Sequence, residues 1–585
     1  MGTLYYGDNL DILKRYLKDE TVDLVYLDPP FNSAQNYNAF FHEKDGTDAA
    51  SQIHAFEDTW HWDIETKKAY DAVTEKPGKV SDVMQAFYTF LGGNDMMAYL
   101  TMMSSRLVEL RRVLKPTGSL YLHCDPTASH YLKLLCDAVM GKENYVNEIS
   151  WKRTTAHSDA KQGSKHFGRI HDIILFYAKH AETTQWNPPW VAHDEKYIES
   201  HYGNLDKTGR RYMWDNITGP GGAAKGNPHY EVLGVSGYWR YSRERMAKLI
   251  AEGLVAIPPG GTKPRLKRYL DEQQGMPVTD WWDDISPLNS QAKERLGYPT
   301  QKPVALLERI ILASTNPGGL VLDPFCGCGT TIDAAEKNGR DWIGIDVTQL
   351  AISLIKNRLQ DTYGSRMKFI SGGTSSTSPT SESGGRAALP RGQADQQVSP
   401  TESIGMGSRT SIVRIIGEPT TPNEAATLAD DDKYQFQWWA LGLVGARPVE
   451  QKKGADHGID GKILFRDEPK AAKAEQIIIQ VKGGKTGVKD VRDLRGVLDR
   501  EKAAIGILIS LQPATGPMET EAASAGFYEH KTNQQTFPRL QLRTVKELME
   551  GKGIERPSTV AATDETFRKA PESMKKHGEQ KALEL

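Results

Sequence analysis

Four consecutive residues near the N-terminus could hold an amino group in place for reaction. Asp28, Pro29, Pro30 and Phe31 follow the apolar run LVYL, which is typical of a buried strand. The two prolines fix φ and remove N–H donors, so the loop is stiff and its carbonyl groups can face a ligand. Asp28 and the Pro29 carbonyl could accept the two hydrogens of an exocyclic amine, while the Phe31 ring stacks on a base. An ordinary proline-rich strand end is the alternative interpretation.

A second group of residues, far along the chain, could bind a nucleoside. The segment VLDPFCGCGTT (321–331) is typical of a buried strand that turns through Gly327 and Gly329 into a helix. These glycines would let the backbone approach a ligand closely, and the helix N-terminus offers unpaired N–H groups. Asp346 follows the next apolar strand, where an acid can bind ribose hydroxyls. The turn lacks the lysine of a nucleoside triphosphate loop and departs from the G-x-G-x-x-G dinucleotide pattern.

Together these segments resemble one family. FCGCG with the preceding Asp-Pro resembles motif I of S-adenosylmethionine-dependent DNA methyltransferases, and the DPPF tetrapeptide resembles motif IV of enzymes that methylate amino groups. Motif IV precedes motif I here, which is the circularly permuted order of the β group of DNA adenine-N6 and cytosine-N4 methyltransferases. The resemblance covers about residues 1–365. It implies S-adenosylmethionine as cofactor and Asp28, Pro29, Pro30 and Phe31 as catalytic residues. Aspartate at the first position favours adenine, and cytosine-N4 methylation is the open alternative.

The same resemblance implies a set of cofactor-binding residues. YYGDNLDIL at the start resembles motif III, and YPTQKPVALLERII (298–311) resembles motif X, a helix entrance beside the methionine part of the cofactor. The implied set is Asp8, Thr300, Gln301, Lys302, Asp323, Phe325, Gly327, Gly329 and Asp346. Lys302 would lie near the carboxylate of the cofactor, and a solvated lysine is the alternative.

The expected substrate is double-stranded DNA. A base inside a duplex cannot reach a buried loop, so the target base must be flipped out of the helix. The whole chain has a formal charge of only −2, yet between residues 225 and 270 nine Lys and Arg residues stand against three Glu, with Tyr238, Trp239 and Tyr241 interleaved. This local excess predicts a DNA-facing segment, and a solvated loop is the alternative.

The C-terminal part contains residues suited to phosphodiester hydrolysis. Asp460 precedes the strand-like run KILF, and Gln480 and Lys482 are two apart on the next one, hence on one face. A carboxylate with a second oxygen ligand can hold Mg²⁺, and a lysine can orient a hydrolytic water. The pattern resembles the Mrr-like branch of the PD-(D/E)xK restriction endonucleases over about residues 411–555. It implies Asp460, Gln480 and Lys482 as nuclease residues with Asp460 as the Mg²⁺ ligand. A domain that only binds DNA or a partner is the alternative.

These motifs must be positioned by two α/β domains. Short apolar runs alternate with longer amphipathic stretches before residue 371, which predicts a Rossmann-like, circularly permuted methyltransferase sheet with a target-recognition insertion. A smaller α/β restriction-endonuclease-like domain follows. The expected boundaries are 1–150 for the catalytic half, 151–285 for the insertion, 286–370 for the cofactor-binding half, 371–410 for a flexible linker, 411–555 for the nuclease-like domain and 556–585 for a tail.

The amino-acid composition limits the class of protein and the cellular compartment that we expect. The chain has 585 residues, enough for several domains, and only four cysteines, too few for a disulfide framework. Cys326 and Cys328 lack a second Cys or His pair nearby, so packing in the turn is favoured over a metal site. No apolar stretch is long enough to span a membrane. We expect a cytoplasmic protein without membrane partners, and a homodimer is one open assembly.

Overall fold

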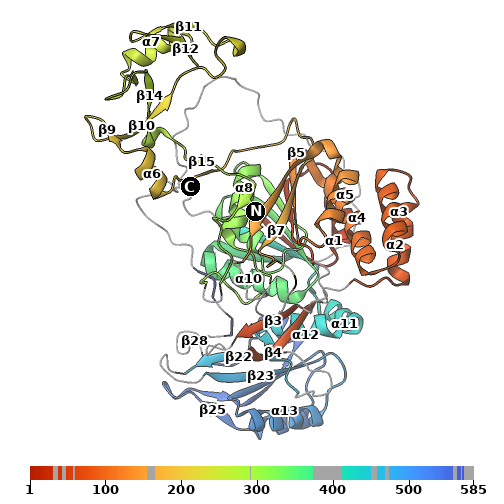
Figure 1. Ribbon diagram of the computed structural model, residues 1–585. Helices are drawn as coiled ribbons and strands as arrows, with labels where there is room; N and C mark the ends of the chain where they lie inside the picture. Colours follow the sequence, from red (N-terminus) through yellow and green to blue (C-terminus); the bar gives the residue numbers. More distant parts are fainter. Residues whose placement is uncertain are drawn as a thin grey trace, which may run out of the picture. The chain divides into compact units, whose positions relative to one another are not determined.

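The computed structural model describes most of the chain, and Figure 1 shows its elements coloured along the sequence. The described residues are 1–30, 37–42, 48–56, 60–154, 165, 167–289, 292–298, 300–372, 410–449, 458–467, 474–557, 563, 564, 566, 567 and 569–571, with only the backbone described over 37–42, over 48–56 and at 563. The chain forms two compact units. The first comprises Met1–Asn187 and Asp280–Met574, and the second comprises Pro188–Thr279 with Lys575–Leu585, which lie outside the described residues.

A ten-stranded sheet organises the methyltransferase-like part of the first unit. Its order is β16 (Trp281–Trp282), β6 (Tyr145–Lys152), β7 (His171–Ala178), β5 (Leu114–Cys124), β2 (Val22–Leu27), β17 (Leu320–Asp323), β18 (Asp341–Asp346), β1 (Gly2–Tyr6), β20 (Ser411–Ile416) and β19 (Met367–Gly372). Neighbouring strands run parallel except where β7 pairs with β5 and β6. The strands before the two motifs, β2 and β17, are direct parallel neighbours, with Leu24 opposite Val321. Both motif loops therefore leave the sheet at the same edge.

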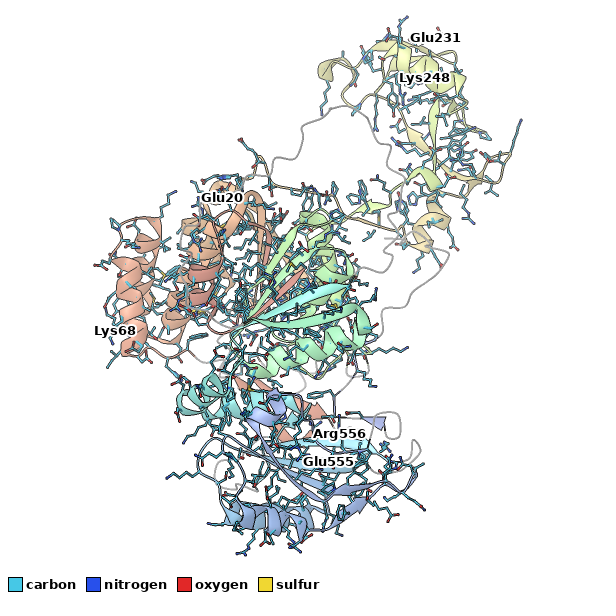
Figure 2. The ribbon with its side chains drawn as sticks, turned by 180° about the vertical axis from the view of Figure 1, so that it is seen from behind. Glu20, Lys68, Glu231, Lys248, Glu555 and Arg556 are labelled. Atoms are coloured by element: carbon cyan, nitrogen blue, oxygen red, sulfur yellow. The ribbon has the colours of Figure 1, made fainter. Side chains whose placement is uncertain are left out.

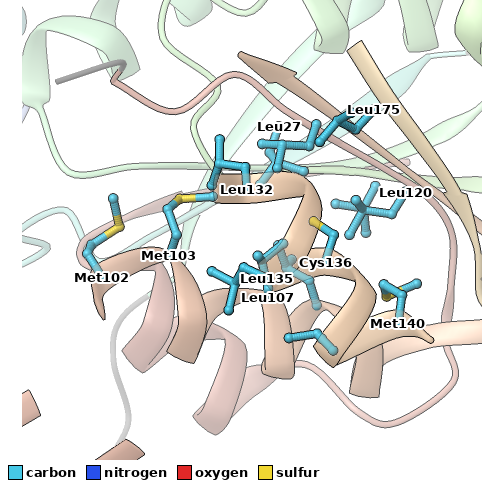
Figure 3. Packing of buried hydrophobic residues seen from close by; sticks show 14 of the residues in the cluster. Leu27, Met102, Met103, Leu107, Leu120, Leu132, Leu135, Cys136, Met140 and Leu175 are labelled. Carbon is cyan, nitrogen blue, oxygen red and sulfur yellow. The ribbon is translucent and has the colours of Figure 1, made fainter. Parts of the chain in front are cut away.

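Helices pack through apolar faces on this sheet or on one another. They are α1 (Asn9–Tyr16), α2 (Ile64–Thr74), α3 (Lys79–Leu91), α4 (Asp95–Val113), α5 (Ser129–Met140), α8 (Val304–Ser314), α9 (Thr330–Lys337) and α10 (Gln349–Tyr363); β3 (Tyr37–His42) and β4 (Asp48–Phe56) form an antiparallel pair. Figure 3 shows the core in which Leu107 of α4 and Leu132 and Leu135 of α5 lie close to Leu27 and Leu120. Burying each leucine contributes about 2 kcal/mol, so this core fixes the strands that carry the motifs.

Two expected domain boundaries differ from the structure. The segment from 411 was assigned to the nuclease-like domain, but β20 pairs with β1 and β19 in the first sheet, where Val413 and Ile415 are buried. The insertion expected over 151–285 contains β7, which pairs with β5 inside the sheet. The sequence-based boundaries failed because strand pairing joins segments that composition alone separates.

The second unit is a small, separately packed region. It comprises β8 (Trp190–Val191), α6 (Glu195–His201), β9 (Asn204–Leu205), β10 (Arg211–Asn216), β11 (His229–Val232), β12 (Val235–Tyr238), α7 (Arg243–Ala251), β13 (Val255–Ala256), β14 (Arg265–Tyr269) and β15 (Met276–Pro277). Strands β13, β14, β10 and β9 form a four-stranded sheet. Trp239, Met246, Leu249 and Leu266 belong to its own buried core.

The C-terminal domain has a six-stranded sheet between helices. Strands β21 (Arg447–Pro448), β22 (Gly461–Arg466), β23 (Glu475–Lys482), β24 (Ile505–Ser510) and β27 (Leu540–Thr544) lie in that order, and β28 (Thr563–Asp564) pairs with β22. The helices are α11 (Pro422–Asp431), α12 (Lys433–Leu443), α13 (Val488–Glu501), α14 (Gly516–Ala523) and α15 (Val545–Met549), and β25 (Phe527–Glu529) pairs with β26 (Thr536–Pro538). Ile477 and Ile479 pack with α12, whereas Ile478 packs with α13. Strand alternation thus directs Gln480 towards the α13 face.

The helices of the described chain are short or mixed in polarity. None of those within the described ranges is both long and apolar enough to cross a membrane.

Candidate active site

One cavity brings the two predicted groups of residues together. It has a volume of about 280 Å³. The predicted residues that line it are Asp8, Asp28, Pro29, Pro30, Thr300, Gln301, Lys302, Asp323, Phe325, Gly327 and Asp346. Gly329 does not line it, and Phe31 lies outside the described residues. The cavity opens where parallel strands β2 and β17 end side by side, which is where ligands bind in open α/β sheets.

The turn after β17 has a backbone conformation that favours glycine at two positions. Gly327 has φ +48° and Gly329 has φ +77°, the left-handed region that side chains rarely adopt. A Cβ on Gly329 would also lie 2.7 Å from Cγ1 of Ile355, and one on Gly327 would lie 3.2 Å from Cε1 of Tyr298. The turn therefore lies close against its neighbours and presents backbone, not side chain, to the cavity.

Asp346 is hydrogen-bonded to this turn and to the residue that caps the next helix. Its Oδ2 accepts the Gly327 N–H at 2.9 Å, and its Oδ1 accepts the backbone N–H and hydroxyl of Thr348 at 2.9 and 2.8 Å. Burial raises the pKa of Asp346 above the usual aspartate value. A carboxylate held in this way keeps lone pairs for the hydroxyl groups of a nucleoside, as the sequence predicts.

Asp323, at the end of β17, is a buried acid at the base of the cavity. It is 3% exposed, and its Oδ1 accepts the Phe325 N–H at 3.0 Å. Burial raises the pKa of Asp323 to about 7, although hydrogen bonds from Thr331 and Phe325 oppose the shift. Asp323 therefore shapes the turn and gains or loses a proton near neutral pH.

Lys302 pairs with the predicted catalytic acid. Its Nζ donates to Oδ2 of Asp28 at 2.5 Å, and the side chains are only 12% and 16% exposed. The sequence expected Lys302 to face the cofactor carboxylate. The structure shows it lining the cavity and joined to Asp28, so the ammonium can fix one carboxylate oxygen of Asp28 in place.

Arg106 is a cavity residue that the motifs did not indicate. Its Nη2 donates to Oδ2 of Asp8 at 2.6 Å and its Nε donates to Oδ1 of Asn9 at 2.5 Å, while Asn9 Nδ2 donates to the Pro324 carbonyl at 2.7 Å. Asp8 also caps α1 by accepting from Leu10 N–H. The only sequence signal for Arg106 was a charge within an otherwise buried helix. Arg106 thus connects the motif III segment to the motif I turn.

Gln301 and Thr300 lie at the entrance of α8. Gln301 Oε1 accepts the Leu296 N–H at 2.8 Å, and its Nε2 donates to the Glu294 carbonyl at 2.5 Å. Glu294 in turn accepts the Val304 N–H at the start of α8 at 3.2 Å. The polar atoms of Gln301 therefore stabilise the loop that contains it, and Gln301 forms part of the cavity wall.

A buried arginine supports the glycine turn from behind. Arg358 of α10 is 2% exposed; it donates to Oδ2 of Asp333 at 2.9 Å and to the carbonyl of Cys328 at 3.3 Å. Cys326 and Cys328 are buried free thiols, and burial raises the pKa of both. No three His, Cys, Asp or Glu side chains of the described residues gather as a metal site.

The basic segment of the second unit is partly engaged within that unit. Arg268 donates to Asp215 at 2.5 Å, Lys267 lies over the Tyr212 ring and Arg243 over the Tyr230 ring. Figure 2 labels Glu231 and Lys248 in this region. The full set of nine basic residues is Lys225, Arg240, Arg243, Arg245, Lys248, Lys263, Arg265, Lys267 and Arg268. Some of this charge therefore makes contacts within the unit.

The predicted nuclease residues converge on β22 and β23. The Asp460 N–H donates to the Ile479 carbonyl at 2.9 Å, and Asp460 Oδ2 accepts the Val481 N–H at 2.7 Å. Asp460 therefore lies against β23 on both sides of Gln480. Lys482 ends the same strand. The structure thus brings all three predicted residues to one region of the sheet.

Gln480 has one amide atom bonded and one unpaired. Its Nε2 donates to the Gly458 carbonyl at 2.7 Å. Its Oε1 is buried and has no hydrogen-bond partner among the described residues, and the residue is only 4% exposed. Leaving a buried carbonyl oxygen unpaired costs about 1 to 3 kcal/mol. A cation beside Asp460 would satisfy this oxygen, so the donor set fits a hard divalent metal.

Family models match both parts of the chain that carry the predicted sites. A family model described as DNA methylase matches residues 22–357, and one described as restriction endonuclease matches residues 438–528. The first match covers more than half of the chain, which therefore belongs to this DNA methylase family. The methyltransferase and Mrr-like resemblances inferred from the sequence are confirmed.

Individual relatives are named as methyltransferases or as a subunit of a restriction-modification enzyme. The type II methyltransferase M.EcaI of Enterobacter cloacae is 28% identical over 361 residues, covering 61% of this chain and 69% of the relative. The Mod subunit of the type III enzyme StyLTI of Salmonella typhimurium is 27% identical, covering 56% and 48%. The DNA adenine methyltransferase YhdJ of Escherichia coli is 24% identical, covering 61% and 82%. The chain thus spans about half of the Salmonella subunit and more of the other two.

Solved structures with some likeness include the M1.HpyAVI complex with S-adenosylmethionine, at 16% identity and a TM-score of 0.29, covering 61% of this chain and 99% of that one. The cytosine-N4-specific PvuII DNA methyltransferase is 14% identical with a TM-score of 0.27, covering 60% and 84%.

The chain thus combines a DNA methylase over residues 22–357 with an Mrr-like restriction-endonuclease domain over residues 438–528. The predicted fold class is confirmed for both domains.

Proposed function

We propose that the chain methylates N6 of adenine in double-stranded DNA and that Asp28 holds the target amine. The observation that carries this proposal is the cavity in which the Asp28 loop and the Gly327 turn face one another. S-adenosylmethionine supplies an activated methyl group when bound. The glycine turn and Asp346 would hold the nucleoside of the cofactor. Asp8 and Arg106 would form the cavity wall next to α1.

Asp28 and the Pro29 carbonyl would receive the target amine. Lys302 already occupies Oδ2 of Asp28, so Oδ1 and the Pro29 carbonyl are the acceptors that face the two amine hydrogens. Fixing the amine this way points its lone pair at the methyl group, and such positioning supplies much of the rate in a methyl transfer. The Phe31 ring is proposed to stack on the base.

Adenine is favoured over cytosine on two grounds. Aspartate stands first in the tetrapeptide, and a relative with 24% identity is named a DNA adenine methyltransferase. Cytosine-N4 methylation is the rival product. The basic second unit, Pro188–Thr279, is proposed to bind the duplex while the base is flipped into the cavity.

Product analysis tests this function. Purified protein is incubated with duplex DNA and labelled S-adenosylmethionine, and the DNA is digested to nucleosides. We expect N6-methyldeoxyadenosine and no N4-methyldeoxycytidine. Label found only in N4-methyldeoxycytidine would overturn the base assignment, and DNA without label would overturn the function.

A second activity, Mg²⁺-dependent DNA cleavage, is proposed for the C-terminal domain. The unpaired Oε1 of Gln480 next to Asp460 favours it, because a metal ion there would gain one anionic and one neutral oxygen. Lys482 would then orient the attacking water. A neutral ligand in place of a second carboxylate predicts a weak metal site.

Cleavage is tested with plasmid DNA, unmethylated and methylated, with and without Mg²⁺. Wild type should cut one of the two substrates only with Mg²⁺, and Lys482→Ala should not. Cutting that persists in the variant would refute the site, and no cutting of either substrate would favour a DNA-binding domain. The homodimer and the cytoplasmic location expected from the sequence stay predictions, and the mass of the protein in solution tests the first of them.

A further inference from the structure

A chain of three buried polar side chains leads away from the catalytic loop. The Tyr26 hydroxyl lies 3.0 Å from His123 Nδ1, and His123 Nε2 lies 3.1 Å from Asp172 Oδ2. The three residues come from the adjacent strands β2, β5 and β7, and they are 2%, 0% and 3% exposed. Burying polar groups in a sheet core is costly unless each is hydrogen-bonded, and here each of the three is bonded to the next.

The inner end of this chain lies at the cavity. Tyr26 lines the cavity together with Asp28, and the two residues are two apart along the chain, at the end of β2. The outer end leads towards solvent, because Asp172 Oδ1 lies 3.0 Å from Nε of Arg153, whose side chain is 47% exposed. The chain therefore runs from the cavity to the surface of the sheet.

The charge states of Asp172 and Tyr26 bear on which atoms donate the hydrogen bonds between these three side chains. Burial opposes ionisation of Asp172, but His123, Lys302 and Arg153 hold the pKa of Asp172 below the usual value, so it is a carboxylate. A carboxylate only accepts, so His123 Nε2 carries the hydrogen of this contact. Burial and the nearby carboxylates raise the pKa of Tyr26 well above its usual value, so its hydroxyl remains protonated and can donate to a His123 Nδ1 that carries no hydrogen.

We propose that Tyr26, His123 and Asp172 form the relay that removes the proton released by methylation of the target amine. The inference rests on the proposed function. The amine nitrogen uses its lone pair to form the N–C bond, and the C–S bond breaks with its electrons remaining on sulfur. One of the two hydrogens of the methylated nitrogen then leaves its acceptor on the Asp28 loop and passes as a proton to the Tyr26 oxygen. Tyr26 gives its hydroxyl proton to His123 Nδ1, and the imidazolium is stabilised by the Asp172 carboxylate.

Two other acids line the same cavity and are weaker candidates. Asp28 shares its charge with the Lys302 ammonium at 2.5 Å, so protonating Asp28 would break that ion pair. Asp323 accepts the Phe325 N–H at the cofactor turn, and it is the rival acceptor that the experiment must separate.

The first test uses the protein without cofactor or DNA. In protein labelled with ¹⁵N-histidine, the His123 signals are those missing from His123→Asn. We expect the tautomer with hydrogen on Nε2, and we expect the Nδ1 signal to shift in Tyr26→Phe. A hydrogen on Nδ1 of the neutral ring in the wild type would overturn the relay, because Tyr26 could not then pass its proton on.

The second test measures transfer and binding separately. Tyr26→Phe removes one hydroxyl, and we expect its single-turnover methylation rate to fall at least about tenfold while the Kd for S-adenosylmethionine changes less than about twofold. Tyr121→Phe is the matched control: Tyr121 is opposite Tyr26 on β5, equally buried, and its hydroxyl lies 2.7 Å from Ser314 Oγ, outside the cavity lining. This control should transfer at the wild-type rate.

Distinct outcomes separate the two proposals. A wild-type rate in Tyr26→Phe, or a larger loss in Asp323→Asn with Tyr26→Phe unaffected, would refute the relay while leaving methylation intact. A wild-type protein that methylates no DNA would refute the proposed function, and the tautomer measurement would still decide the hydrogen-bond direction.

Discussion

Lys302 Nζ lies 2.5 Å from Asp28 Oδ2, across 274 positions of sequence. The contact joins the motif X segment to the tetrapeptide that begins at Asp28, and both residues line the cavity. Removing the ammonium in Lys302→Met should leave a half-buried carboxylate without its cation, which costs about 1 to 3 kcal/mol. We expect the single-turnover rate to fall at least about tenfold.

Lys302→Arg is the control for this prediction, because it keeps the charge and should recover part of the rate. The measurement is rapid-quench methylation at saturating S-adenosylmethionine. A wild-type rate in Lys302→Met would show that the ion pair does not position Asp28.

The glycine turn provides a prediction with a matched pair of variants. Gly329→Ala places a side chain at φ +77° and against Ile355, whereas Gly339→Ala at φ +69° meets no atom within 4 Å. Both should lose about 1 to 2 kcal/mol from the left-handed backbone. Only Gly329→Ala should also weaken S-adenosylmethionine binding, by at least about tenfold in titration calorimetry. Equal affinities in the two variants would argue against a cofactor role for this turn.

Asp323 predicts a pH dependence of stability. The pKa of Asp323 is raised to about 7, so the native state binds this proton more tightly than the unfolded chain does. The resulting stabilisation is full below about pH 4 and is lost as the pH rises to about 7, by up to about 1.4 kcal/mol per pH unit. Asp323→Asn should lose this slope.

The readout is the thermal transition that S-adenosylmethionine shifts, followed by calorimetry at pH 5.5 and pH 7.5. Other carboxyl groups contribute equally to both proteins, so the difference between wild type and Asp323→Asn reports Asp323. A Tm that falls equally in both proteins between these pH values would contradict the assignment.

Because Gln480 is a neutral ligand, we expect its replacement by an anionic residue to raise the affinity for Mg²⁺. Gln480→Glu adds a second anionic oxygen beside Asp460, so the Mg²⁺ concentration for half-maximal cleavage should fall several-fold. Gln476→Glu is the control on the same strand, since Gln476 Nε2 donates to the Glu501 carbonyl at 2.9 Å. An unchanged Mg²⁺ requirement in Gln480→Glu would place the metal elsewhere.

The sequence predicted the site best where function is encoded in short segments. The Asp28 loop and the Gly327 turn were each readable locally, because an apolar strand followed by prolines or glycines has few structural interpretations. The parallel pairing of β2 and β17 then brought them together, as expected for this fold.

Residues that act through long-range contacts were not predictable. Arg106, His123 and Asp172 carry no local pattern, and each becomes meaningful only when strands or helices from distant segments meet. The pairing of β20 with β1 was missed for the same reason, since composition marked a linker but not the strand that follows it.

The most direct test of the central claim compares wild type with Asp28→Ala on duplex DNA and labelled S-adenosylmethionine. We predict N6-methyldeoxyadenosine from the wild type, a rate about 100-fold or more lower in Asp28→Ala, and a cofactor Kd within about threefold of wild type, because the glycine turn and Asp346 remain intact. A variant that methylates DNA at a near-wild-type rate would contradict the account.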